Sequence, residues 1–182
     1  MANRSSSEFA RRDAGFSLLE LVIVICIIAV LAAFAVERLM TVRADAERAA
    51  MESFVAGLRS ALGIRVAGLL SKGQLDQIAR LAGSNPVERL AEVPENYAGA
   101  YYGIDPALIE GGNWYFDTRD RTVVYRVRFS EYFQTSLAGP PRARFIVMAN
   151  YDAPDAGAGG EPAARVTGIR LVAAEPYQWI IR

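Results

Sequence analysis

One long apolar run stands near the start of the chain. From Phe16 to Val36 the sequence reads FSLLELVIVICIIAVLAAFAV, and its one charged residue is Glu20. About 20 apolar residues in a helix cross the roughly 30 Å hydrocarbon core of a bilayer. Lipid offers the backbone no hydrogen-bond partner, so a segment that crosses it must be helical. The pattern therefore predicts a membrane-spanning helix over residues 16–36.

The chain after this run keeps a helical period but becomes amphipathic. Its apolar positions recur at spacings of three and four and so share one face: Met51, Val55, Leu58, Leu62, Val66 and Leu69. We expect one helix of about 50 residues, half in lipid and half amphipathic, that ends near residues 71–73 with this stripe in a core. Gly57, Gly63 and Gly68 weaken its last turns or allow a sheet to approach closely.

The period changes to two in the C-terminal part. Residues 113–116 and 122–129 flank a polar turn and predict a β-hairpin, and residues 144–150, 165–174 and 177–181 predict further strands. Residues 74–112 are expected to form a connector with one or two short helices. A long helix followed by hairpin-linked strands predicts an α+β fold, in which an antiparallel sheet covers the apolar face of the helix.

Composition narrows the possible functions. The 182 residues are 52% hydrophobic, carry 20 Lys+Arg against 20 Asp+Glu, and include no His and a single Cys, Cys26. This excludes a disordered charged tail, an intrachain disulfide and a cysteine-based zinc site. Without His the usual general base is missing, and no nucleophile or phosphate-loop motif is present. We expect no enzyme and no cofactor.

Charge around the apolar run bears on its orientation. Arg4, Arg11 and Arg12 precede it, and positive residues favour the cytoplasmic side, which would export the C-terminal part. The alternative is an ordinary signal peptide, because Ala33-Phe34-Ala35 fits a small-x-small cleavage site. Cleavage after Ala35 would release a periplasmic or secreted binding protein. Against it, the run is longer than the 7–15 residues a signal peptide needs, and it contains Glu20.

The segment GFSLLE, residues 15–20, followed by the apolar run, closely resembles the N-terminal signature of type IV pilins and type II secretion pseudopilins. The resemblance implies that prepilin peptidase cuts between Gly15 and Phe16, and that Phe16 is then N-methylated. It also implies a pilin-like fold of three parts: a leader peptide over residues 1–15, the transmembrane half of the helix over 16–36, and a periplasmic, filament-exposed head over 37–182.

The resemblance gives Glu20 a role in filament assembly, because it occupies the fifth position of the mature chain. There it would pair with the N-terminal amine of a neighbouring subunit, which makes both charges less costly in an apolar bundle. The implied partners are prepilin peptidase, other pilin or pseudopilin subunits, an inner-membrane assembly platform and, before assembly, membrane lipid. The implied location is the inner membrane, spanned once, and then a pilus or pseudopilus.

Departures from the family pattern refine this interpretation. Glu37 stands where many members have proline, Ala29 stands where a glycine often occurs, and the C-terminal cysteine pair of many major pilins is missing. We therefore expect a minor pilin or a pseudopilin. A third hypothesis is a membrane-anchored protein that never joins a filament.

Two further groups of residues could bind ligands. Asp152, Asp155 and Glu161 lie in a glycine-rich loop and could hold calcium, although their spacing is not dense enough for a strong site. Six arginines could contact nucleic acid phosphates, but a solvated sheet face explains them equally well, and we do not expect nucleic acid binding: Arg119, Arg121, Arg126, Arg128, Arg142 and Arg144.

Overall fold

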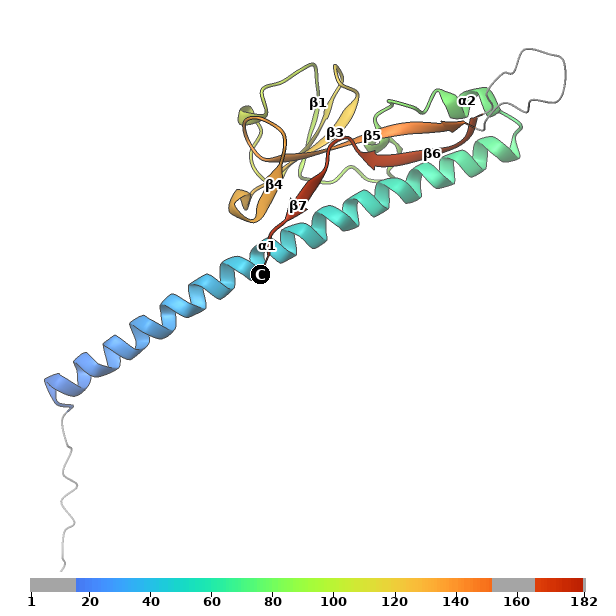
Figure 1. Cartoon of the computed structure of the whole chain (residues 1–182). Helices are drawn as coiled ribbons and strands as arrows, with labels where there is room; N and C mark the ends of the chain where they lie inside the picture. The colour runs from blue at the N-terminus through green and yellow to red at the C-terminus, as the bar shows by residue number, and fades with distance from the viewer. Residues whose placement is uncertain (1–15, 152–165, 182) are drawn as a thin grey trace, which may run out of the picture. The chain divides into compact units, whose positions relative to one another are not determined.

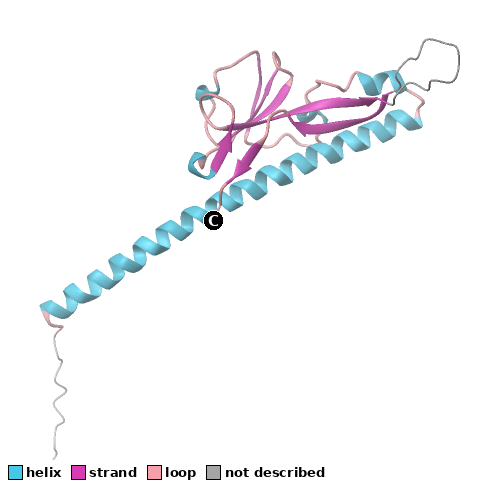
Figure 2. Ribbon diagram, in the orientation of Figure 1, coloured by secondary structure: helices cyan, strands magenta, loops and turns pink. Residues whose placement is uncertain are grey.

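The computed structural model describes residues 16–151 and 166–181, and the chain divides into two compact units between Met40 and Thr41. The first helix, α1 (Leu18–Ser71), has 54 residues and contributes to both units. Its bounds confirm the prediction of one long helix that ends near residue 71. Figure 1 shows the elements that follow it, and Figure 2 separates helices from strands. They are α2 (Leu75–Ala79), the short 3₁₀ turns Pro86–Arg89, Pro106–Leu108 and Ser130–Tyr132, and the strands β1 (Tyr97–Tyr101), β2 (Trp114–Asp117), β3 (Thr122–Arg126), β4 (Phe133–Thr135), β5 (Arg142–Tyr151), β6 (Val166–Ala173) and β7 (Tyr177–Trp179).

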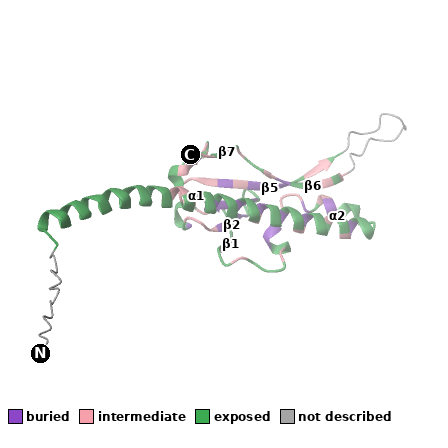
Figure 3. Cartoon of the chain, turned by 90° about the horizontal axis from the view of Figure 1, so that it is seen from below, coloured by how far each residue is buried: buried purple, intermediate pink, exposed green. Residues whose placement is uncertain are grey.

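In the first unit, the part of α1 before Met40 is exposed at every position (Figure 3). Among the described residues, α1 is the one helix long and apolar enough to cross a membrane. Side chains such as Leu18, Leu31 and Phe34 are more than 60% exposed. Lipid or other apolar helices can cover such a surface, whereas water solvates it poorly.

The second unit is built on a five-stranded sheet of order β1-β2-β3-β5-β6, with a separate two-stranded sheet of β4 and β7. The pairs β2–β3, β3–β5, β5–β6 and β4–β7 are antiparallel. This agrees with the predicted α+β layout of a long N-terminal helix on a largely antiparallel sheet. The predicted hairpin is β2 and β3, in which Trp114 pairs with Tyr125 and Asp117 pairs with Thr122.

Strand β1 was not predicted, and it pairs in parallel with β2. The connector over residues 74–112 was expected to contain no strand. The sequence of β1, YAGAY, lacks the β-branched residues that are enriched in strands, and Gly99 has a φ of +113°. The strand therefore depends on its partner β2 rather than on local preference.

The main core lies between α1 and the five-stranded sheet. Met51, Val55, Leu58 and Leu62 from α1 are nearly inaccessible and form one cluster with residues of the sheet. The ring of Trp114 contacts those of Phe54 and Tyr125, with centroid distances of 4.5 and 4.7 Å. These contacts confirm the predicted apolar stripe. Burial of each such aliphatic side chain stabilises the head by about 1.5–3 kcal/mol.

The opposite face of the hairpin is buried as well. Tyr115 of β2 and Val124 of β3 pack with Ile109, and the partly buried Ile104 lies against them. The loop between β1 and β2 supplies both isoleucines. Strand β3 is therefore buried on both faces, because this loop covers the face that does not pack on α1.

The three helical glycines do not approach the sheet. A Cβ atom added at Gly57, Gly63 or Gly68 would meet nothing within 4 Å. The expectation that they allow close packing is therefore wrong, and the stripe that packs on the sheet consists of larger side chains.

Candidate functional site

The first candidate site is the N-terminal turn of α1. Phe16 precedes the helix and is 67% exposed, and Gly15 lies outside the described residues. Ser17 caps the helix, because the backbone N–H of Glu20 donates to Ser17 Oγ at 3.2 Å. The backbone N–H of Leu21 donates to the Ser17 carbonyl at 3.1 Å, which closes the first helical turn.

Ser17 and Glu20 have the spacing of a capping box, S-x-x-E, in which the two side chains each satisfy the other residue's backbone N–H. Only the bond to Ser17 Oγ is formed among the described residues, and the carboxylate of Glu20 accepts no hydrogen bond there. The carboxylate therefore remains available to a donor from outside the described chain. It also lies in the first turn, where the helix dipole favours negative charge. The sequence contains this capping pattern, but the interpretation of residues 15–20 overlooked it.

The second candidate site is a buried carboxylate, Glu47, which is 9% exposed. Its Oε1 accepts from the Tyr125 hydroxyl at 2.9 Å and from the Arg128 backbone N–H at 2.6 Å. Its Oε2 accepts from the Phe129 backbone N–H at 2.9 Å. Three donors from the end of β3 and the turn after it thus satisfy one carboxylate from α1, as a buried charge requires.

This arrangement affects Tyr125. Burial of the phenol, together with the negative charge and hydrogen bond of Glu47, holds the pKa of Tyr125 well above its usual range. Sequence reasoning missed Glu47, although a signal existed: it lies four residues before Met51 and therefore on the same helical face as the apolar stripe. A lone carboxylate on a core stripe indicates a buried partner.

A cavity of about 620 Å³ opens beside Glu47. Arg43, Ala46 and Ala50 line it from α1, while Arg128 and Phe129 line it from the segment that follows β3. The Nε of Arg128 donates to the Gly111 carbonyl at 3.1 Å, which holds the guanidinium in place. In the described part of the chain, no ion pair joins Arg43 to a carboxylate.

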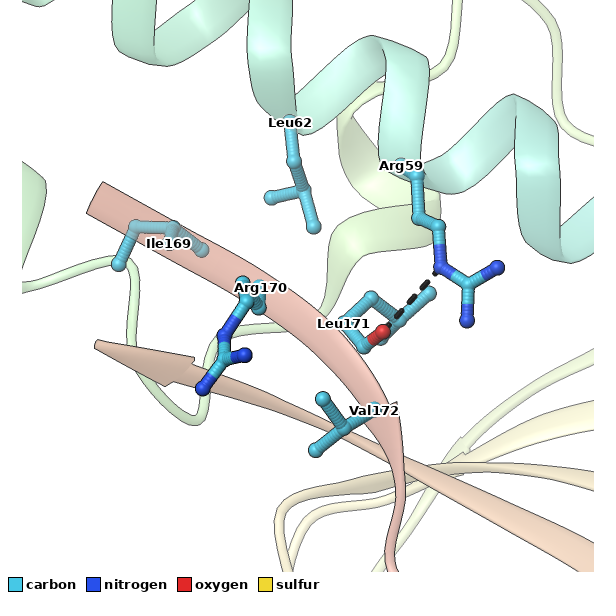
Figure 4. Close-up of a pocket in the computed structure, with 6 residues that line it drawn as sticks. All are labelled: Arg59, Leu62, Ile169, Arg170, Leu171 and Val172. Atoms are coloured by element: carbon cyan, nitrogen blue, oxygen red, sulfur yellow. Dashed lines mark hydrogen bonds between the residues drawn. The ribbon is translucent and has the colours of Figure 1, made fainter. Parts of the chain in front are cut away.

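A second cavity, of about 380 Å³, lies between α1 and β6 (Figure 4). Leu62 and Ile169 give it apolar walls, and the Nε of Arg59 donates to the Leu171 carbonyl at 3.2 Å. Strand β6 is at the edge of the sheet, where unpaired carbonyls invite another strand. The bond from Arg59 satisfies one of these carbonyls and so hinders the pairing of another strand at this edge.

Most of the six arginines considered for nucleic acid serve to tie loops together. Arg126 and Arg142 donate to backbone carbonyls, including those of Pro141 and Pro140. Arg144 pairs with Glu175 and with Asp120. The hydrogen bond to Glu175 is the main cause of the raised pKa of Arg144, whereas burial lowers the pKa of Arg126.

Two other arginines of the set cover glycines that have positive φ. The side chain of Arg121 lies over Gly83, which has φ +68°, and that of Arg119 lies over Gly103, which has φ +59°. The set is therefore a group of loop contacts rather than a free basic surface.

The described residues contain no cluster of three His, Cys, Asp or Glu side chains that could hold a metal ion. The possible calcium ligands Asp152, Asp155 and Glu161 lie outside the described residues.

The comparisons with known proteins bear on the first site. A family model described as the prokaryotic N-terminal methylation motif matches residues 10–36. Comparison of the whole chain with curated proteins and with solved structures gave no match. The matched residues include Gly15, Phe16 and Glu20 and end where the apolar run ends.

The chain therefore carries the prepilin-type signature of type IV pilins and pseudopilins, as its resemblance to them indicated. The signature supports a processed, pilin-like structural subunit. It implies processing by prepilin peptidase and assembly with other pilin subunits. The single N-terminal apolar helix fits a membrane-anchored pilin.

Proposed function

We propose that the chain is a minor pilin or a pseudopilin, a structural subunit of a type IV pilus or a type II secretion pseudopilus. One observation carries this proposal. The methylation motif at residues 10–36 covers the start of α1 and its apolar segment, and the first turn there holds a carboxylate with no hydrogen-bond donor among the described residues.

In this proposal, prepilin peptidase cuts between Gly15 and Phe16, and the new amine of Phe16 is methylated. Residues 16–36 then hold the subunit in the inner membrane, with the head, residues 37–182, in the periplasm. An inner-membrane assembly platform lifts the subunit into the filament, where apolar helices cover the segment that lipid covered before.

Glu20 is the proposed assembly residue. An N-terminal amine has an unperturbed pKa of about 7.7–8.0 and is mostly cationic at neutral pH. Pairing with a carboxylate lowers the free energy of both charges in an apolar surrounding. A neighbour whose amine meets Glu20 would therefore be held at one axial position among several that apolar packing alone allows.

Cleavage after Ala35 is the alternative. Ala33, Phe34 and Ala35 lie inside α1, so a signal peptidase would have to unwind the helix at this point. Mass analysis of the N-terminus of the mature protein separates the possibilities. Methylated Phe16 supports the pilin, Val36 supports a released protein, and an intact leader starting at Met1 supports an anchored protein that is not processed.

A second experiment tests Glu20. We expect Glu20→Ala and Glu20→Gln to be inserted and cleaved normally but to enter filaments at least tenfold less often than wild type, because both remove the charge. Glu52→Ala, on the exposed face of the same helix, is the matched control. Normal incorporation of both Glu20 variants would refute the assembly role and leave the processing site untouched.

A further inference from the structure

The cavity beside Glu47 has the features of an anion site. Arg43 lines it from α1, and Arg128 lines it from the segment that follows β3. The one carboxylate that lines it, Glu47, already accepts three hydrogen bonds. The lining of the cavity therefore carries two positive charges against the one negative charge of Glu47, whose oxygens are already engaged by donors of the head.

The two arginines are prepared for a ligand in different ways. The Nε of Arg128 bonds to the Gly111 carbonyl, and its guanidinium lies over Gly112, where an added Cβ would be 2.7 Å from Nη2. The bond from Nε fixes the guanidinium of Arg128 and leaves its terminal nitrogens, Nη1 and Nη2, to donate to a ligand. Arg43 has no ion-pair partner among the described residues, so it can turn toward an anion at little cost.

The position of Arg43 in the sequence indicates the kind of anion. Arg43 lies seven residues after Val36, or about 10 Å along a helix, and the headgroup layer extends about 5–8 Å beyond the hydrocarbon core. A helical side chain points back toward the N-terminus, which carries this guanidinium toward the bilayer. Leu39 and Val42 are each about half exposed, which extends the apolar surface almost to Arg43. Phe129 adds an aromatic side chain to the lining of the cavity.

We propose that Arg43 and Arg128 bind the phosphate of an anionic phospholipid headgroup while the subunit is anchored in the bilayer. Guanidinium groups pair with phosphate through parallel charge-assisted hydrogen bonds. The bound lipid would fix the head at the membrane surface before assembly, and the head would have to release it on entering a filament. This inference rests on the proposed membrane anchoring but not on cleavage or methylation.

The test uses the full chain reconstituted in nanodiscs of phosphatidylcholine that contain a minor fraction of phosphatidylglycerol. Native mass spectrometry then measures which lipids remain bound to the protein. Each arginine near the surface is expected to enrich phosphatidylglycerol about fivefold. Arg43→Gln and Arg128→Gln should each lose that factor, and 0.5 M salt should weaken the enrichment through screening.

Arg65→Gln is the matched control, because Arg65 is an exposed arginine on the same helix, about 33 Å further along it. It should retain the wild-type enrichment. Arg43→Gln is the cleaner variant, since it removes no bond within the head. Its unfolding midpoint should equal that of wild type, which separates loss of the lipid from loss of the fold.

Several results would overturn the proposal. Anchored wild-type chains that show no preference for phosphatidylglycerol would refute it, as would an equal loss in Arg65→Gln. Arginine-dependent dimers without lipid enrichment would show that the cavity binds a carboxylate of a second copy instead. Chains that do not insert into the nanodisc at all would refute membrane anchoring, and with it the proposed function.

Discussion

Replacement of Glu47 by alanine should destabilise the head strongly. The substitution leaves the Tyr125 hydroxyl and the backbone N–H groups of Arg128 and Phe129 without their acceptor. Hydrogen bonds to a charged group contribute about 1.5–3 kcal/mol each. Water entering from the adjoining cavity recovers part of this sum, and loss of a buried charge partner typically costs about 3–5 kcal/mol. We expect the free energy of unfolding to fall by about that amount.

Glu47→Gln should fall between wild type and alanine. Its amide oxygen can still accept from Tyr125 and Arg128, which both donate to Oε1. Its NH₂ group would face the Phe129 N–H, which donates to Oε2 in the wild type, so two donors would oppose each other. A loss of about 1–3 kcal/mol is expected.

The assay is urea unfolding of the full chain in detergent micelles, followed by tryptophan fluorescence. Trp114 and Trp179 both lie in the head and report on its core. With a urea dependence of about 2 kcal/mol per M, Glu47→Ala should lower the midpoint by about 2 M. Glu52→Ala removes an exposed i,i+4 pair with Arg48 and should leave the midpoint nearly unchanged, because water and salt screen such a pair. Equal midpoints for Glu47→Ala and Glu52→Ala would refute the assignment of Glu47 as a point of attachment between α1 and the sheet.

The remaining predictions concern the head. The pKa of Tyr125 is raised in the fold, so the stability that this phenol contributes is complete below its unfolded pKa of about 10 and is lost as pH rises above that value. Tyr125→Phe should therefore reduce the slope of the unfolding free energy against pH in that range by up to about 1.4 kcal/mol per pH unit. Equal slopes for the variant and the wild type in urea unfolding would contradict this. Gly57→Ala should raise the free energy of unfolding by about 0.5–1 kcal/mol, because alanine favours a helix and nothing lies within 4 Å of the new Cβ. Gly111→Ala should lower the free energy of unfolding by about 1–3 kcal/mol, because the new Cβ would be 2.8 Å from Arg128 Cα. Thermal unfolding of the two glycine variants in parallel measures both effects. A lower stability of Gly57→Ala, or an unchanged stability of Gly111→Ala, would contradict the space that the structure shows around these glycines.

The parts of the fold that local sequence determines were predictable. The apolar run and the stripe from Met51 to Leu69 follow from helical periodicity, and the hairpin of β2 and β3 follows from alternation around a polar turn. Strand β1, strand β4 and the pairing of β4 with the predicted strand β7 could not be predicted in the same way. Each depends on a partner that is distant in the chain, and β4 has only three residues.

The candidate sites show the same division. Glu20 is recognisable because the motif around it is local, within residues 10–36. The hydrogen bonds of Glu47 are not recognisable in this way, because their donors are 78 to 82 residues away in the chain. The contacts of the six arginines depend on distant partners in the same way, because Arg126 and Arg142 donate to loop carbonyls that a count of charges does not reveal.

A buried carboxylate in the helix–sheet contact needs a physical reason, because an apolar side chain of similar size often stabilises a core equally well. The stripe of Met51, Val55, Leu58 and Leu62 consists of similar side chains at regular spacing, so a shift of α1 by one turn, about 5.4 Å, would still place apolar groups against the sheet. Such a shift would take Glu47 away from its three donors, and it would also break the bond from Arg59 to the Leu171 carbonyl. The apolar stripe therefore supplies most of the attraction between α1 and the sheet, while these two polar contacts select one register, which is the use of a buried polar group with the best support in proteins.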